Sequence, residues 1–282
     1  MSQQNLDPPE QQSRVCSVDA RTHADLKHRL PTWSHGSATA EGSSLTEPRT
    51  RHNADKTRAP SPSRKVQSVE VLVFLGLILP SLVQSALSGG LGDLKFDVVV
   101  PLTILTDFGL LGLILYFLWR NGEPVRCIGW TFGRLKHDLA WGLMMFFPMA
   151  FVVNALARAL HGIGASLPHR PPSSLVIHGN SDLSLALILV VVVAVVEETI
   201  FRGYLLLRLT ALTNNTLAAV LLSSIVFALG HGYEGLAGMA GVFVLGFLFA
   251  VVYLWRRSLV APIVAHFLTD FVALALPGLV GK

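Results

Sequence analysis

Charged residues are scarce in this sequence. Only 14% of the 282 residues are Asp, Glu, Lys or Arg, whereas about 25% is usual for a soluble domain. Hydrophobic residues make up 51% of the chain, and the mean hydropathy is +0.54. This composition is unusual for a soluble domain and indicates a polytopic membrane protein.

Cysteine is also scarce, with Cys16 and Cys127 as the two present. This number favours neither a disulfide framework nor a cysteine-type metal site. The net charge of +4 is small, and residues 1–65 hold most of it, with 10 Lys or Arg residues against 7 Asp or Glu residues. The basic balance is thus a property of the N-terminal region, and we expect no nucleic-acid partner.

The first 65 residues lack a sustained apolar run and are rich in Ser, Pro, Gln, Arg, Asp and His. Such a composition is typical of a disordered polar tail. No segment near the start has the form of a signal peptide, so none is expected. We predict three regions: a disordered tail at 1–65, N-terminal transmembrane helices with a basic interfacial loop at 66–182, and a transmembrane core at 183–277.

Apolar runs dominate the chain from Val66 onward. A membrane-spanning helix needs about 20 mostly apolar residues. We therefore expect an all-α bundle of about seven transmembrane helices, of which the fifth is short. The candidate stretches are residues 69–87, 98–119, 139–160, 183–209, 217–233, 236–255 and 259–276.

The loops between these stretches differ in charge, and Lys and Arg in short loops favour the cytoplasm. Lys95 and Arg170 lie in one set of loops. The other set carries Arg64, Lys65, Arg120, Arg126, Arg134, Lys136, Arg208, Arg256 and Arg257. This bias predicts a multi-pass integral membrane protein with a cytoplasmic N-terminus and an external C-terminus. In the basic loop 121–138, Trp130 and Phe132 are predicted to lie at the level of the lipid headgroups.

Three ionisable residues interrupt the fourth apolar stretch. Glu197 and Glu198 follow a run of valines, and Arg202 comes four residues after Glu198. Each charge at the bilayer centre costs about 2.5–3.5 kcal/mol on insertion scales, and such residues usually mark a functional site. Residues four apart share a helix face, which predicts a pair between Glu198 and Arg202. Glu197 is rotated by about 100° and is predicted to meet partners on other helices.

Polar residues also interrupt the fifth and seventh stretches. His231 follows Phe227 by four residues, and Asp270 follows His266 by four, so each pair is predicted to share a face. Counted from the nearest helix end, Glu197 and His231 lie about 22 Å deep, and His266 lies about 14 Å deep. These depths predict one shared site.

The three motifs together resemble a known family. Their order and spacing are similar to those of the CPBP family, also called Abi or the type II CAAX prenyl protease-like intramembrane endopeptidases. The flanking segments EETIFRGYLL and HGYEGLAG look similar to it as well. The resemblance covers about residues 183–277, and its motif positions are Glu197, Glu198 and Arg202 (EExxxR), Phe227 and His231 (FxxxH), and His266 and Asp270 (HxxxD).

The resemblance implies hydrolysis of a peptide bond within the membrane. Glu197 would act as general base on a water held with His231, and apolar surroundings make a carboxylate a stronger base. His266 and Asp270 would position or stabilise the oxyanion. Many members carry Asn where Asp270 stands, and an ionised Asp would oppose an oxyanion.

The other two motif residues, Glu198 and Arg202, would hold the scaffold on this interpretation, which completes the set of candidate catalytic residues. A site within lipid must also admit water, so a hydrophilic cavity that opens to the cytoplasm is expected. The expected partners are the lipid bilayer and a membrane-associated or lipidated protein substrate. The compact core favours a bacterial cell membrane as the location, and nothing indicates the oligomeric state.

The favoured hypothesis is a glutamate-type protease that requires no cofactor. The HExxH motif of helical zinc proteases is absent. Histidines and carboxylates can nevertheless bind zinc, and its ligands would then be Glu197, His231 and His266.

Two other classes of function stay open. Some members of the family are associated with bacteriocin self-immunity or act as scaffolds, so the main alternative is a non-proteolytic partner of membrane proteins. A proton-coupled transporter would also use intramembrane Glu and His residues. Against a transporter, no internal repeat relates the two halves of the chain.

Overall fold

The computed structural model describes residues 62–88, 95–165, 176–177 and 179–280. Nearly all of the predicted tail at 1–65 lies outside these residues. The described part of the chain is helical and contains no strand, which confirms the predicted all-α class.

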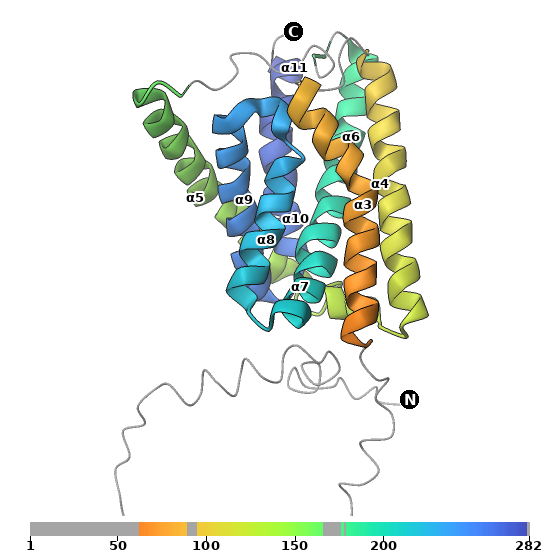
Figure 1. The fold of residues 1–282 in the computed structure, drawn as a ribbon. Coiled ribbons are helices and arrows are strands. Elements are labelled where there is room, and N and C mark those ends of the chain that lie inside the picture. The colour runs from red at the N-terminus through yellow and green to blue at the C-terminus, as the bar shows by residue number, and fades with distance from the viewer. Residues whose placement is uncertain (1–61, 89–94, 166–175, 178, 281–282) are drawn as a thin grey trace, which may run out of the picture. The chain divides into compact units, whose positions relative to one another are not determined.

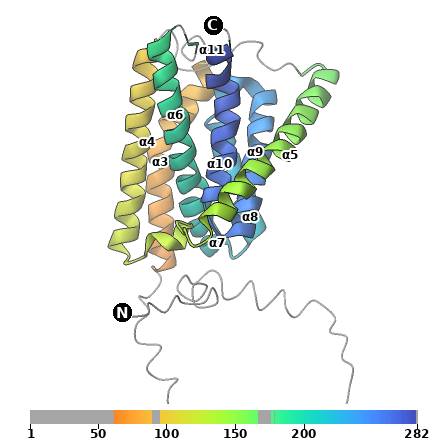
Figure 2. The ribbon, with the colours of Figure 1, turned by 180° about the vertical axis from the view of Figure 1, so that it is seen from behind.

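The helices pack as a bundle, in which α3, α4 and α6 stand side by side and α8, α9 and α10 lie next to them (Figures 1 and 2). Their bounds are α3 (Arg64–Ser88), α4 (Phe96–Arg120), η1 (Val125–Ile128), α5 (Leu135–Gly162), α6 (Asn180–Glu198), η3 (Thr199–Leu205), α7 (Leu206–Thr213), α8 (Thr216–Leu229), η4 (Gly232–Glu234), α9 (Gly235–Arg256), α10 (Val260–Asp270), η5 (Phe271–Ala275) and α11 (Leu276–Val280).

Five of these helical segments are long and apolar enough to cross a membrane, with lengths from 22 to 34 residues. Two shorter apolar helices, Thr216–Leu229 and Val260–Ala275, match the fifth and seventh predicted stretches. The polytopic helical bundle is thus confirmed. The predicted end of the fifth helix at residue 233 is wrong, because α8 stops at Leu229 and a 3-10 turn follows.

A tight turn between α7 and α8 makes these two helices neighbours. Asn214 ends α7 with φ of 53°, in the left-handed region that asparagine tolerates better than most residues. The side chain of Asn215 then accepts a hydrogen bond from the backbone of Ala218 and caps α8. The polypeptide therefore reverses within two residues.

A buried ionic cluster surrounds Glu70 of α3. Its carboxylate accepts hydrogen bonds from Arg120 and Asn121, each at 2.7 Å, from Tyr204 at 2.9 Å and from Arg208 at 3.0 Å. Arg208 also pairs with Glu123. The cluster ties α3 and the end of α4 to η3 and α7.

The basic residues that were predicted to be cytoplasmic gather at one end of the bundle. Arg64 at the start of α3 donates to the carbonyl of Leu212 at 2.7 Å. Arg256 at the end of α9 pairs with Asp138 at the start of α5, also at 2.7 Å. These contacts agree with the prediction that the loops rich in Lys and Arg lie on one side of the membrane. Which side of the membrane this end faces stays a prediction.

Part of the basic loop 121–138 packs into the bundle. Ile128 is fully buried, Trp130 is partly buried against two core clusters, and Phe132 is 58% exposed. The headgroup level of Trp130 and Phe132 stays a prediction. The loop inserts because Gly203 of η3 leaves room for it: a Cβ at this glycine would lie 2.7 Å from the carbonyl oxygen of Ile128.

The first half of α5 packs against α10, while its second half leans away from the bundle (Figures 1 and 2). Its buried residues are Asp138, Gly142 and Met149, and none lies beyond the middle of the helix. The leaning half leaves space beside α9 and α10, where the candidate site lies.

Candidate active site

The EExxxR motif lies where the helix changes its winding. Glu198 is the last residue of α6, and Thr199–Leu205 form a π-helical segment. Such segments are rare and frequently occur at functional sites. The hydroxyl of Ser223 on α8 donates to the carbonyl of Phe201 at 2.9 Å, which supports the wider turn from a neighbouring helix.

Glu198 and Arg202 form the predicted ion pair. The distance from Arg202 Nη1 to Glu198 Oε1 is 2.9 Å, and the two side chains are 1% and 0% exposed. Glu198 is not neutralised within its own helix alone, because Nδ1 of His266 lies 2.8 Å from the same oxygen. The predicted pair with Arg202 is confirmed, and His266 is a second partner of Glu198 that the i,i+4 spacing did not predict.

Aromatic rings enclose the Arg202 guanidinium. It lies 4.2 Å from the ring centroid of Phe227 and 5.2 Å from that of Phe249. A ring face attracts a cation, most strongly where water is excluded. The close fit also requires Gly246, since a Cβ there would lie 3.0 Å from the Phe227 ring and 3.4 Å from Arg202.

Glu197 differs from its neighbour. Its side chain keeps 21% of its surface exposed, and its Oε2 lies 3.8 Å from Nε2 of His266. This oxygen is buried and has no hydrogen-bond partner within the described part of the chain. Glu197 is thus close to the histidine but is not held by it.

His266 connects the motifs. Its Nδ1 pairs with Glu198, and its Nε2 lies 3.4 Å from Asp270 Oδ2. The imidazole stacks on Phe249 at a centroid distance of 5.1 Å and meets Phe227 edge-on at 5.9 Å. The predicted i,i+4 pair of His266 and Asp270 therefore exists, and the two phenylalanine rings restrict the movement of the imidazole.

His231 lies just after α8, and its ring contacts Phe227 as the motif spacing predicted. Its Nδ1 lies 3.1 Å from the Phe227 carbonyl oxygen. Because a carbonyl only accepts, Nδ1 carries the proton, and Nε2 of the neutral ring is left as an acceptor.

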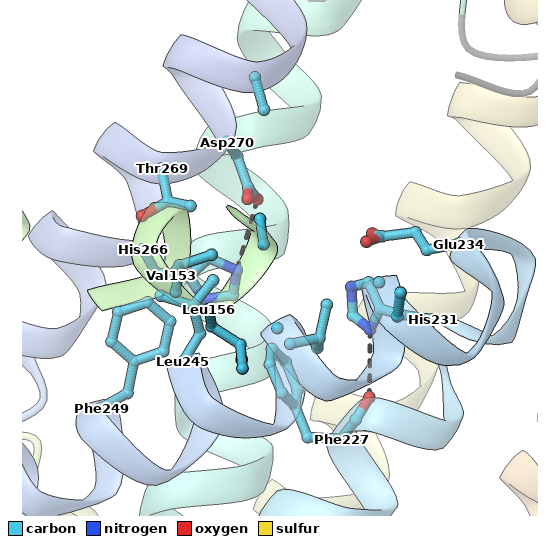
Figure 3. Close-up of a pocket in the computed structure, with 16 residues that line it drawn as sticks. Val153, Leu156, Phe227, His231, Glu234, Leu245, Phe249, His266, Thr269 and Asp270 are labelled. Carbon is cyan, nitrogen blue, oxygen red and sulfur yellow. Dashed lines mark hydrogen bonds and ion pairs between the residues drawn. The ribbon is translucent and has the colours of Figure 1, made fainter. Parts of the chain in front are cut away.

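A cavity of about 260 Å³ lies between the FxxxH and HxxxD motifs. Figure 3 shows His231 and Glu234 on one wall and His266 and Asp270 on the other, with Phe227 below. The remaining lining is largely apolar and comes from α5, α9, α10 and η5. His266 lines this cavity and also contacts Glu197, which itself is not a lining residue.

The cavity extends away from the basic end of the bundle. On α9 its lining begins at Ala237, near the helix start, and stops at Phe249, well before Arg256. On α10 and η5 it runs from His266 to Ala273. The lining residues thus lie toward the end of the bundle opposite the basic end, while the side of the membrane on which the cavity opens stays a prediction.

Two acidic residues near the site were missed by the sequence interpretation. Glu234 lines the cavity. Asp107 of α4 interacts electrostatically with Glu197. The free-energy cost of a charged side chain inside an apolar stretch pointed to Glu197. The same argument applies to Asp107. Nothing in the apolar pattern could have found Glu234, because it lies in a turn.

The described residues contain no group of three His, Cys, Asp or Glu side chains placed to hold a metal ion. The zinc set considered from the sequence, Glu197, His231 and His266, is therefore not arranged as a metal site. A reaction without a catalytic metal stays a prediction.

Fold and site together define a class: a helical membrane protein with carboxylates and imidazoles clustered beside an internal cavity. Residues 179–272 match the model of the family described as Rce1-like, type II CAAX prenyl endopeptidase Rce1-like. This match covers about a third of the chain and contains all three motifs, so it confirms the predicted relationship to the CPBP family for this region. At family level it supports a CAAX-protease-like intramembrane endopeptidase. Searches of curated proteins and of solved structures found no match.

Proposed function

We propose that this protein cleaves a membrane-associated protein and that Glu197 activates the hydrolytic water. The contrast between two adjacent carboxylates carries this proposal. Glu198 is fully buried and engaged by Arg202 and His266. Glu197 is partly exposed, and its ion-pair partner His266 lies 3.8 Å away, farther than either partner of Glu198. A general base needs an available oxygen.

In the proposed reaction, Glu197 removes a proton from a bound water while the water oxygen attacks the carbonyl carbon of the scissile bond. The tetrahedral intermediate then collapses, the C–N bond breaks, and the proton passes to the leaving amine. The products are a carboxyl group and an amine. The free Nε2 of His231 suits a hydrogen bond from the water.

The oxyanion of the intermediate requires a donor, and we assign this role to Nε2 of a protonated His266. Glu198 holds the other ring nitrogen at 2.8 Å and so determines the direction of the ring. Asp270 lies 3.4 Å from Nε2, where it orients the imidazole and does not itself meet the oxyanion. An aspartate in place of the usual asparagine is compatible with this role.

The cavity walls support access for a substrate from the lipid. Val153 and Leu156 line the cavity and belong to the half of α5 that leans away from the bundle (Figures 2 and 3). A peptide tethered to the membrane can approach along this apolar side, with its scissile bond near His266. The proposed substrate is therefore a membrane-tethered or lipidated protein.

Substrate trapping tests the proposal. Glu197→Gln keeps the shape of the side chain but cannot act as a base, so it should retain a bound substrate that mass spectrometry identifies. The matched control is Asp97→Asn, which makes the same acid-to-amide change at an exposed position at the start of α4. Undiminished cleavage by Glu197→Gln would remove Glu197 from the reaction.

The non-proteolytic alternative makes a different prediction. A scaffold or immunity factor needs its buried charges for folding and for partner binding, and not for proton transfer. Full biological function of a well-expressed Glu197→Gln variant would therefore favour a partner protein over a protease.

A further inference from the structure

Asp107 is the only charged residue of α4 between Asp97 and Arg120. Its Oδ2 is buried and has no hydrogen-bond partner among the described residues. A polar group in an apolar membrane interior is costly unless another group satisfies it. The position therefore requires a partner, and α6 is the neighbouring helix on the side that α4 packs against.

The packing register of α4 and α6 identifies that partner. The two helices run side by side in the same direction (Figures 1 and 2). One core cluster contains Val100 and Ile104 of α4 together with Leu189 and Val193 of α6. Continuing this register by one turn leads to the next pair of facing positions. They are Asp107, three residues after Ile104, and Glu197, four residues after Val193.

Two further observations agree with this register. The charge of Asp107 acts electrostatically on Glu197. Each of the two carboxylates also has one buried oxygen without a hydrogen bond, Oδ2 of Asp107 and Oε2 of Glu197. Ionised carboxylates only accept hydrogen bonds, so a proton or a water must lie between two that face each other.

We propose that Asp107 is a positioning residue for Glu197, joined to it by a hydrogen bond directly or through one water. This bond would hold one oxygen of Glu197 and leave the other for the hydrolytic water. The inference rests on the proposed function, because it requires Glu197 to be the base. Asp107 lies outside the matched region 179–272, so α4 adds a part of the site that the three motifs do not contain.

The test compares two substitutions in the full-length protein, with cleavage of a trapped substrate as the assay. Asp107→Leu removes the hydrogen bond and should lower kcat about 10–100-fold, the usual effect of losing such a support, with little change in KM. Asp107→Asn can still donate to Glu197 and should stay within about threefold of the wild type. Thr106→Val is the control for disturbance of α4, because the hydroxyl of Thr106 donates to the carbonyl of Leu102 in its own helix.

If Asp107→Leu does not fold, Asp107→Ala removes the group without added bulk. An unchanged kcat in a folded Leu or Ala variant would overturn the inference, and so would an equal loss in the Asn and Leu variants. These results leave the proposed function intact as long as Glu197→Gln is inactive. Cleavage by Glu197→Gln would overturn the proposed function and this inference with it.

Discussion

The buried pair of Glu198 and Arg202 makes Glu198→Gln a sharp test of the scaffold. The substitution removes one negative charge and leaves the shape of the side chain nearly unchanged. Arg202 is 1% exposed and, among the described residues, then has no full negative charge within ion-pair distance. Its two terminal nitrogens have no hydrogen bond of good geometry among the described residues. The variant therefore leaves a cation buried among aromatic rings.

The expected loss follows from the cost of an orphaned buried charge. Breaking a buried ion pair by removing one partner usually destabilises a protein by about 3–5 kcal/mol. The rings of Phe227 and Phe249 offset part of this cost, since a desolvated cation–π contact contributes about 2 kcal/mol. We therefore expect the free energy of unfolding to fall by about 1–3 kcal/mol.

The assay is thermal inactivation of the detergent-solubilised protein, followed as the fraction that stays monodisperse after heating. Glu197→Gln is the matched control, because the same chemical change one residue earlier leaves Arg202 paired. Replacing both partners, as Glu198→Gln with Arg202→Met, should recover stability, since an apolar substitute for a buried pair is often neutral. The reasoning fails if Glu198→Gln is as stable as the wild type while Glu197→Gln is not.

Two further predictions concern packing and metal. Gly203→Ala should destabilise the protein by about 1–3 kcal/mol, because a Cβ there meets the carbonyl of Ile128 at 2.7 Å. Gly112→Ala, with no neighbouring atom within 4 Å, should be neutral or slightly stabilising in the same thermal assay. A chelator such as EDTA should leave cleavage by the purified protein unchanged, whereas loss of activity with recovery on adding zinc would show that a metal takes part.

Sequence patterns within single helices were enough to predict much of the fold and half of the site. Apolar runs of about 20 residues identify spanning helices without tertiary information. The i,i+4 rule paired Glu198 with Arg202 and His266 with Asp270, because both partners belong to one helix. The pair of Phe227 and His231 was found in the same way, although α8 ends between them.

Contacts between helices were not predictable in this way. The bond from His266 to Glu198 joins residues 68 positions apart, so no spacing rule reaches it. The insertion of Ile128 into the core depends on the space beside Gly203, which no spacing rule reveals. The cavity takes its lining from α5, α9, α10 and η5, which only the tertiary structure brings together. Asp107 is the exception, since the energetic argument applied to Glu197 holds for it equally.

The central claim is that Glu197 is the catalytic base, and its most direct test is the rate at which purified Glu197→Gln cleaves a membrane-tethered substrate. General-base catalysis contributes about 10²–10⁴-fold, so the variant should be slower than the wild type by at least about 100-fold. It should remain as stable as the Asp97→Asn control. A folded Glu197→Gln variant that cleaves at close to the wild-type rate would contradict the account.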